Sequence, residues 1–208
     1  MALATRVGMM ASQDRLEKLI AERLQSGVDK AAIDKRIWDL YGEEWAVMFT
    51  DLSGFSRHVA EFGIIHFLQI ISESQRIFIP CIDTHDGILL KLEGDSMMVL
   101  FRNAGKAIAC AVDMQHAARD YNVGREDAEK ILLCVGLGFG RLLKIGDHDV
   151  FGAEVNAASK LGEDTAKAWE ILATESVKKA AEGSAGVSFE PIEKAPPGAS
   201  RAYRVRYG

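Results

Sequence analysis

The sequence has few cysteines and prolines, no long hydrophobic run and no excess of positive charge. Its 208 residues include 3 cysteines and 4 prolines, and the formal net charge is −5. This acidic balance disfavours nonspecific binding to nucleic acid or to an anionic membrane. The longest apolar stretch, residues 131–139, is rich in glycine and falls short of the ~18–20 residues that cross a bilayer. We therefore expect neither a nucleic-acid partner nor a membrane span.

The cysteines also indicate the compartment. Cys81, Cys110 and Cys134 are odd in number, scattered and set among apolar neighbours. We interpret them as reduced core residues rather than as a disulfide framework. Residues 1–12 contain one arginine and lack the hydrophobic region and cleavage pattern of a secretory signal. A cytoplasmic location is therefore expected.

Several common signatures of nucleotide or metal chemistry are missing. No G-x-x-x-x-G-K-[ST] phosphate loop occurs in the chain. Gly136, Gly138 and Gly140 are spaced too closely for the dinucleotide-binding fingerprint. The five histidines show no paired metal-ligand spacing. Any nucleotide chemistry must therefore come from other residues.

The beginning of the chain predicts two amphipathic helices. Apolar residues recur at i, i+4 and i+8 from Leu16, after a candidate helix cap at Ser12, and a second helix is predicted over residues 29–41. We assign residues 1–44 to an N-terminal helical extension and residues 45–208 to the main domain. The helical pair is either a brace packed on that domain or a dimerising or signal-receiving element, which would have an upstream regulatory partner.

The main domain alternates short apolar strands with helical segments. Its order, β-α-(α)-β-β-α-β-α-β-α-β-β, contains two βαβ passages around a central hairpin. This predicts an α+β fold (an α/β sandwich) of ferredoxin-like plan, with a mixed, mostly antiparallel sheet and helices covering one face. Strands are expected at 46–49, 88–92, 96–101, 130–138, 169–173, 187–192 and 202–207, and residues 142–145 either continue the strand at 130–138 or pair with it. Helices are expected at 55–62, 65–78, 104–122, 152–161 and 174–181.

Two aspartates stand at the ends of predicted strands, each beside a glycine turn. Asp51 follows the strand at 46–49, and Asp95 lies in the hairpin turn after Gly94. Taken singly, Asp51 is explained equally well as a helix cap and Asp95 as a turn residue. Two hard carboxylate ligands with open room for phosphates suit Mg²⁺. The pair is therefore a candidate metal site.

Four segments, in this order, resemble the catalytic domain of the class III nucleotidyl cyclases, the adenylate and guanylate cyclase family. Residues 49–55 (FTDLSGF) resemble the family's first metal motif, and residues 91–95 (KLEGD) resemble its K-x-x-G-D hairpin. Residues 135–140 (VGLGFG) are similar to the strand and glycine segment that follows. Residues 149–161 (DVFGAEVNAASKL) are similar to D-x-x-G-x-x-V-N-x-A-x-R-L. The resemblance covers roughly residues 45–207 and leaves out the N-terminal helices.

This resemblance implies an enzyme that converts ATP to 3′,5′-cyclic AMP and pyrophosphate with two Mg²⁺ or Mn²⁺ ions. Two ions can serve both ends of an in-line phosphoryl displacement. Asp51 and Asp95 would hold them, with the Leu52 carbonyl as a further ligand. Backbone N–H groups just before the next helix would cradle phosphate. The residues that supply these N–H groups are Ser53, Gly54 and Phe55.

Lys91 and Asp149 match the positions at which the family selects the base. An ammonium only donates and a carboxylate only accepts, which complements the N1 acceptor and exocyclic amino donor of adenine. Guanine presents the opposite polarity, so ATP is the expected substrate. The alternative without a binding role is that Lys91 is a solvated lysine at a strand edge and Asp149 is a turn residue. Asn156 matches the asparagine that positions the ribose.

Lys160 stands where the family carries an arginine that binds phosphate in the transition state. The positive charge is kept, but the planar fork that allows a bidentate phosphate contact is lost. The family also uses a phosphate-binding lysine between its last two strands, where Lys194 lies without a firm motif.

The resemblance also implies a head-to-tail homodimer. In the family the metal aspartates of one site come from one subunit, and the base, ribose and transition-state residues come from the other. This chain carries both sets, so two equivalent sites are expected. The alternative is a catalytically weak or silent cyclase-homology domain that binds nucleotide or dimerises to regulate something else, and Lys160 favours it.

Overall fold

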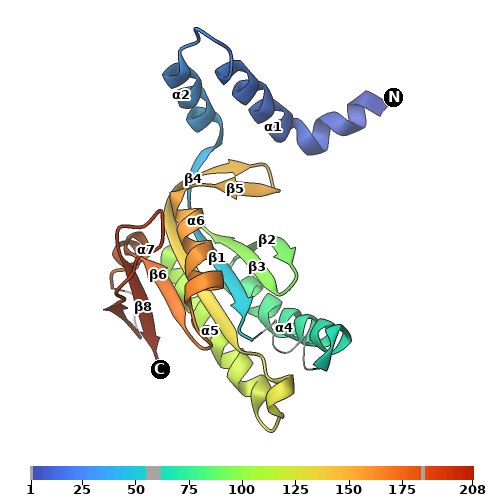
Figure 1. Ribbon diagram of the computed structural model, residues 1–208, viewed down its shortest axis with the longest axis vertical. Coiled ribbons are helices and arrows are strands. Elements are labelled where there is room, and N and C mark those ends of the chain that lie inside the picture. The colour runs from blue at the N-terminus through green and yellow to red at the C-terminus, as the bar shows by residue number, and fades with distance from the viewer. Residues whose placement is uncertain (1, 55–61, 184–185) are drawn as a thin grey trace.

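The computed structural model describes residues 2–54, 62–183 and 186–208, with side chains from residue 11 onward. An α+β domain carries an N-terminal helical pair that projects beyond one end of its sheet (Figure 1). The helices are α1 (Ala2–Arg23), α2 (Lys30–Tyr41), α4 (Ile64–Thr84), α5 (Ala104–Asn122), α6 (Ala153–Ser159) and α7 (Glu175–Ala180), with a 3₁₀ turn η1 (Asp127–Glu129) and a π-helix η2 (Lys160–Thr165). The strands are β1 (Gly42–Leu52), β2 (Ile88–Glu93), β3 (Ser96–Phe101), β4 (Leu133–Ile145), β5 (Asp149–Phe151), β6 (Ile171–Thr174), β7 (Val187–Pro191) and β8 (Ala202–Tyr207).

The described strands form one mixed sheet in the order β2-β3-β1-β4-β6-β8-β7, and β5 pairs with the end of β4. Only the β4–β6 pair is parallel among these ladders. The predicted mixed, mostly antiparallel sheet is therefore confirmed. Strands β1 and β4 lie at its centre, which explains the buried apolar runs 45–49 of β1 and 133–138 of β4.

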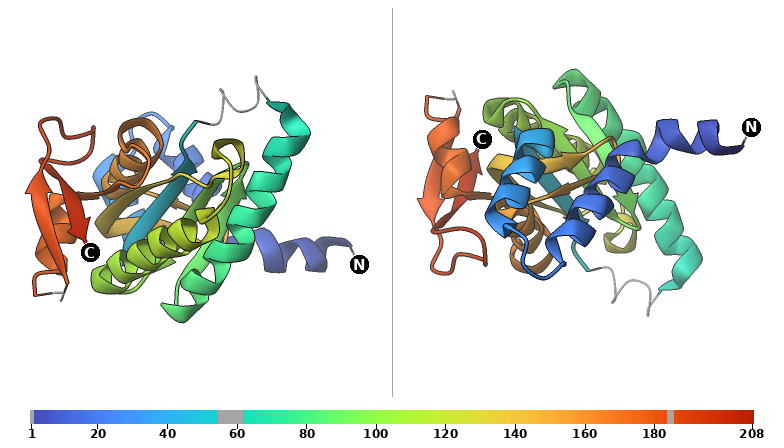
Figure 2. Two further views of the ribbon diagram at one scale, coloured as in Figure 1. Left: turned by 90° about the horizontal axis from the view of Figure 1, so that it is seen from below. Right: turned by 90° about the horizontal axis from the view of Figure 1, so that it is seen from above.

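Helices cover both faces of this sheet rather than the one face expected from the sequence. Successive residues of β1 point to opposite faces. Ala46 and Met48 join the core beneath α4, α5 and α7, whereas Val47 and Phe49 pack with Val155 of α6. Figure 2 shows α4 and α5 on one side of the sheet and α6 on the other.

Glycines of β4 allow α6 and η2 to lie directly on the strand. A Cβ at Gly136 would stand 2.1 Å from the Ala158 carbonyl oxygen, and one at Gly138 would stand 2.3 Å from that of Glu154. A Cβ at Gly162 of η2 would come within 2.8 Å of the Phe49 carbonyl oxygen. The glycine series thus serves close packing of helix on sheet, which fixes where α6 and η2 present their side chains.

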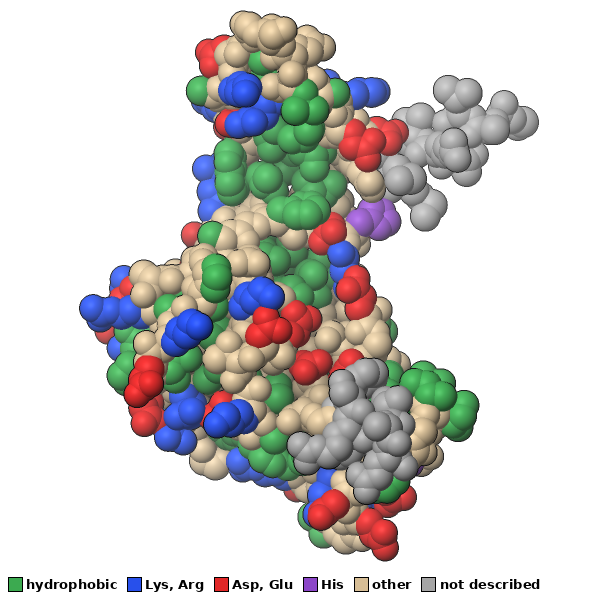
Figure 3. Space-filling view, viewed as in Figure 1, with side chains coloured by type: hydrophobic (Ala, Val, Ile, Leu, Met, Phe, Trp, Pro, Cys, Tyr) green, Lys and Arg blue, Asp and Glu red, His purple; other side chains and the backbone are tan. Residues whose placement is uncertain are grey.

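The N-terminal helices pack on the far end of β4 through a small cluster of their own. Leu19, Ile33, Ile37 and Tyr41 pack with Ile145 in this cluster. Arg23 and Asp34 form an ion pair that joins α1 to α2. A cavity of about 420 Å³ lies beside the cluster, where Figure 3 shows apolar side chains gathered between the helical pair and the sheet. The brace interpretation is thus consistent with the packing, and the 1–44 boundary stays a prediction.

Some predicted elements differ from the structure. The first helix begins before Ser12, which is therefore not its cap; the Ser12 carbonyl instead accepts a hydrogen bond from the Tyr41 hydroxyl at 2.8 Å. The helix predicted at 65–78 continues through Pro80 to Thr84 in α4. Of the two alternatives for residues 142–145, the continuation is confirmed, because they extend the strand predicted at 130–138 into one long strand, β4. The helix predicted at 55–62 lies, except for Phe62, outside the described residues.

Candidate active site

The two aspartates meet where β1 ends and the β2–β3 hairpin turns. Thr50 of β1 pairs with Met97 of β3, so Asp51 lies opposite Ser96 and beside the turn that carries Asp95. The Ser96 hydroxyl donates a hydrogen bond to Oδ1 of Asp51 at 3.4 Å. Gly94 supplies the left-handed backbone, with φ of 61°, that this tight turn needs. Antiparallel pairing thus brings together two carboxylates that are distant in sequence.

The protonation of this pair is strongly perturbed. Burial, together with the negative charges of Asp95 and Glu163, raises the pKa of Asp51 to about 7. Burial likewise raises the pKa of Asp95. The backbone N–H of Leu52 opposes both shifts by hydrogen bonding to the carboxylates. A positive charge would stabilise the ionised forms of these two half-buried acidic groups.

Asp95 also leaves one oxygen without a partner. Its Oδ2 atom is buried and accepts no hydrogen bond from any described residue. A buried polar atom without a partner costs free energy, so such atoms are uncommon unless a ligand or ion satisfies them. This oxygen is therefore available to a cation.

The predicted phosphate cradle is only partly free. The Ser53 backbone N–H donates to the Leu132 carbonyl at 2.8 Å, so this donor is already engaged within the sheet. Gly54 follows with φ of 92°, a conformation that favours glycine. Phe55 lies outside the described residues. Of the described cradle residues, Gly54 is the one left to offer a backbone donor to phosphate.

Lys91 and Asp149 form an ion pair. The Lys91 Nζ atom on β2 lies 2.9 Å from Oδ2 of Asp149 on β5, and the two side chains are 28% and 33% exposed. Lys91 also lines a small cavity of about 20 Å³ with Ser96 and Glu163. The structure thus joins the two predicted base-selecting residues and places Lys91 next to residues that flank the carboxylates.

Asn156 and Lys160 lie on α6 and at the start of η2. The Asn156 amide donates to the Pro197 carbonyl at 3.0 Å. The Lys160 ammonium donates to Oδ2 of Asp164 at 2.6 Å, and this contact raises the lysine pKa. No hydrogen bond or ion pair among the described residues links either side chain to Asp51. Lys194 is exposed between β7 and β8.

Sequence reasoning overlooked two residues of this region, Ser96 and Glu163. Ser96 directly follows Asp95, and this adjacency in a hairpin was an available signal. Glu163 has no such signal, because it approaches Asp51 only through η2, a π-helix that the sequence pattern did not predict. π-Helical turns are rare and are frequent at functional sites.

Comparison with known proteins identifies the family. The family model of the adenylate and guanylate cyclase catalytic domain matches residues 41–196. The chain belongs to this family. A crystal structure of an adenylate/guanylate cyclase/hydrolase from Silicibacter pomeroyi shares the cyclase fold, with a TM-score of 0.68 and 24% identity over 79% of this chain and 95% of that one.

The similar curated cyclases include adenylate cyclases and guanylate cyclases. The chain is 27% identical to an adenylate cyclase of Mycobacterium tuberculosis over 169 residues, 74% of this chain and 38% of that protein. It is 23% identical to guanylate cyclase 2G of Rattus norvegicus over 168 residues, 74% of this chain and 15% of that protein. The chain thus spans well under half the length of these relatives, and their names do not decide its substrate.

The remaining sequence expectations concern thiols and membranes. Cys110 and Cys134 are buried, Cys81 is partly buried, and all three are free thiols, as expected. Among the helices of the described residues, none combines the length and the apolar character needed to cross a membrane.

Proposed function

We propose that this cyclase domain is an adenylate cyclase, which converts ATP to 3′,5′-cyclic AMP and pyrophosphate. The observation that carries the proposal is the ion pair between Lys91 and Asp149. An ammonium has three donors, so Lys91 can keep Asp149 and still donate to N1 of adenine. The second oxygen of Asp149 can accept from the exocyclic amino group. Guanine, with a donor at N1 and a carbonyl at C6, presents this pair with the wrong polarity.

Asp51 and Asp95 would hold two Mg²⁺ or Mn²⁺ ions, with the Leu52 carbonyl as a further ligand. The buried, partnerless Oδ2 of Asp95 and the raised pKa of Asp51 fit such a role. No set of three or more acidic, histidine or cysteine side chains in the described part of the chain is arranged to hold a metal. Mg²⁺ commonly uses one or two carboxylates together with substrate phosphates, so the nucleotide would complete the shell. When bound, such ions stabilise negative charge on the attacking and leaving oxygens.

The other site residues bind and orient the nucleotide in this proposal. The backbone N–H of Gly54 would bind phosphate, and Ser53 and Phe55 are the neighbouring residues that the family resemblance assigns to the same role. Asn156 donates from its amide to the ribose, after releasing the Pro197 carbonyl. Lys160 neutralises charge on the phosphates, after releasing Asp164. Both latter steps exchange one hydrogen-bond partner for another and do not require a change of fold.

The proposed active unit is a head-to-tail homodimer. Asn156 and Lys160 have no described link to Asp51 within one chain, which is consistent with the two halves of a site coming from two subunits. A twofold pair would complete two equivalent sites. The N-terminal helices, residues 1–44, would be a separate extension that contacts an upstream partner, and the protein would act in the cytoplasm.

The decisive test is cyclic nucleotide production by the purified chain with Mn²⁺ and either ATP or GTP. We expect cyclic AMP from ATP, at least about tenfold faster than cyclic GMP from GTP, and loss of this activity in Asp51→Ala. A matched control, Asp147→Ala, removes an exposed aspartate outside the site and should leave the rate unchanged. Faster turnover of GTP than of ATP would refute the adenine assignment.

A second candidate function is a silent cyclase-homology domain that binds nucleotide or dimerises. It is favoured by Lys160, which replaces the family arginine and is held by Asp164. Absence of turnover in the wild type, with activity appearing in Lys160→Arg, would establish this alternative.

A further inference from the structure

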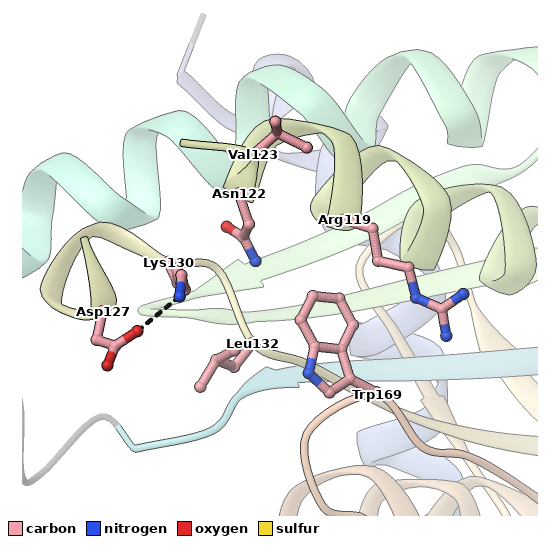
Figure 4. Close-up of a pocket in the computed structure, with 7 residues that line it drawn as sticks. All are labelled: Arg119, Asn122, Val123, Asp127, Lys130, Leu132 and Trp169. Atoms are coloured by element: carbon pink, nitrogen blue, oxygen red, sulfur yellow. Dashed lines mark hydrogen bonds and ion pairs between the residues drawn. The ribbon is translucent and has the colours of Figure 1, made fainter. Parts of the chain in front are cut away.

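A second cavity lies apart from the residues assigned to nucleotide. Its volume is about 620 Å³, within the range of small-molecule pockets. It is formed by the end of α5, the segment that leads to β4, and the turn before β6 (Figure 4). The residues that line it are Arg119, Asn122, Val123, Asp127, Lys130, Leu132 and Trp169. None of them has a role in the proposed cyclisation, so this cavity needs its own explanation.

The charge of the cavity is positive and concentrated on one group. Lys130 is paired with Asp127, at 2.6 Å between Nζ and Oδ1, so these two charges offset each other. Arg119 has no carboxylate partner among the described residues, and its Nη2 donates to the Tyr207 hydroxyl at 3.5 Å. Its guanidinium lies 5.8 Å from the Trp169 ring centroid and 5.1 Å from that of Tyr207. An arginine that is oriented by aromatic rings and has no acidic partner can donate a forked pair of hydrogen bonds to an anion.

The remaining walls are apolar or already satisfied. Val123 is 80% exposed at the rim, and Leu132 and the Trp169 ring supply further apolar surface. The Asn122 side chain is engaged on both sides, because it donates to the Ile131 carbonyl and accepts from the Ile131 N–H, each at 2.8 Å. Asn122 therefore forms part of the cavity wall, and its side chain does not need a hydrogen bond from a ligand.

Trp169 is held in an unusual conformation at this cavity. Its φ is 70°, in the left-handed region that bulky residues rarely adopt. Its N–H donates to the Leu133 carbonyl at 2.8 Å, and its carbonyl accepts from the Tyr207 hydroxyl at 2.7 Å. Backbone strain of this kind persists only where surrounding structure enforces it, and it concentrates at ligand-binding positions. Glycine would adopt this backbone conformation at lower cost, whereas the indole ring both packs on the core and lines the cavity.

We propose that this cavity binds a small planar organic anion, whose ring packs on Trp169 and Val123 and whose carboxylate is bound by Arg119. The ligand needs one negative charge because Arg119 is the cation of this lining that has no acidic partner among the described residues. It needs a flat ring because the Trp169 ring and Val123 form the apolar wall beside Arg119. The site is distinct from the nucleotide site and does not depend on the cyclase being active.

The test uses 6-fluoro-2-naphthoate as the probe and ¹⁹F NMR titration of the full chain as the measurement. The neutral amide of the same ring, 6-fluoro-2-naphthamide, serves as the matched ligand. We expect saturable binding of the carboxylate, with the amide at least about tenfold weaker, since a charge-assisted contact is lost. Equal binding of the two compounds, or no saturable binding of either, would overturn the proposal.

Variants locate the site. Arg119→Met keeps the aliphatic stem and should weaken naphthoate binding at least about tenfold. Trp169→Gly removes the ring at a position whose backbone suits glycine, so it should fold and yet lose binding. The control is Arg125→Met, because Arg125 also stacks on an aromatic ring, that of Tyr121, but does not line the cavity. Undiminished binding in Trp169→Gly, or equal loss in Arg125→Met, would place the ligand elsewhere and refute the assignment.

Discussion

Lys91 and Asp149 form an ion pair at 2.9 Å that joins β2, at the edge of the sheet, to β5, the short strand paired with the end of β4. Because both side chains are about a third exposed, the pair contributes little to stability, typically below about 1 kcal/mol. Lys91→Met should therefore leave the melting temperature nearly unchanged while lowering the rate with ATP by about 10²-fold. The ATP/GTP rate ratio should fall with it. A large loss of stability with an unchanged ratio would mean that the pair is structural.

The raised pKa of Asp51 predicts a pH dependence of folding. The folded protein holds the Asp51 proton more tightly than the unfolded chain does, for which the pKa is near 4. The corresponding stability is present below about pH 4 and is lost as the pH rises through about 7. In metal-free protein, the free energy of unfolding should fall by about 1–2 kcal/mol over this window, a figure reduced for the partial exposure of the group.

The variant Asp51→Asn isolates this effect. Asparagine cannot ionise, so the variant should lack the part of the pH dependence between pH 4 and 8 that Asp51 contributes in the wild type. Its free energy of unfolding should exceed that of the wild type at pH 8. Urea unfolding in the presence of a chelator measures both proteins. Asp147→Asn is a suitable control, because the contact with Lys144 lowers the Asp147 pKa, so that the contribution of Asp147 to stability changes only below about pH 4. Identical pH profiles for wild type and Asp51→Asn would contradict the prediction.

Metal and nucleotide should stabilise the fold together. Mn²⁺ with 3′-deoxy-ATP, which lacks the attacking hydroxyl, should raise the melting temperature at pH 8 by about 5 °C or more at ligand concentrations near 100 times Kd. The rise should shrink at pH 5.5, because metal binding requires ionised carboxylates. Asp95→Asn should abolish the metal-dependent part, whereas Asp127→Asn should not. An equal rise in Asp95→Asn would show that the ions bind elsewhere.

Replacement of Lys160 by arginine tests the transition-state contact. Arginine restores the planar fork, so Lys160→Arg should raise kcat with ATP by about tenfold or more, with a smaller change in KM. Lys179→Arg is the matched control, because Lys179 also pairs with an acidic residue four positions away on a surface helix. An unchanged kcat in Lys160→Arg would place residue 160 outside the chemistry.

Gly136 tests the close contact between β4 and α6. A Cβ there would lie 2.1 Å from the Ala158 carbonyl and 2.3 Å from the Gly162 nitrogen, both backbone atoms that cannot move alone. Gly136→Ala should lower the free energy of unfolding by about 3 kcal/mol or more. At Gly152 the nearest atom is 3.2 Å away on the Leu142 side chain, so Gly152→Ala should cost about 1 kcal/mol or less. Similar costs for the two variants would show that α6 can shift away from the strand.

Local patterns determined much of the fold. The helix predicted at 104–122 matches α5, and the Asn103 side chain caps it by accepting from the Lys106 N–H at 3.1 Å. The hairpin of β2 and β3 followed from its Gly94 turn. Such signals lie within a few residues of each other, where backbone conformation and capping act directly. The four cyclase-like segments, including Asp51 and Asp95, were likewise visible in the sequence alone.

The tertiary structure decided what depends on contacts between distant segments. The face of the sheet that α6 covers is set by packing of Val155 against Phe49, which no local periodicity encodes. The glycines of β4 proved to be packing positions, because only their distance to α6 and η2 shows what a side chain would strike. The electrostatics of Asp51 depend on burial and on Glu163, over a hundred positions away along the chain. Sequence named the chemical groups, and the sheet and its covering helices determined how those groups influence one another.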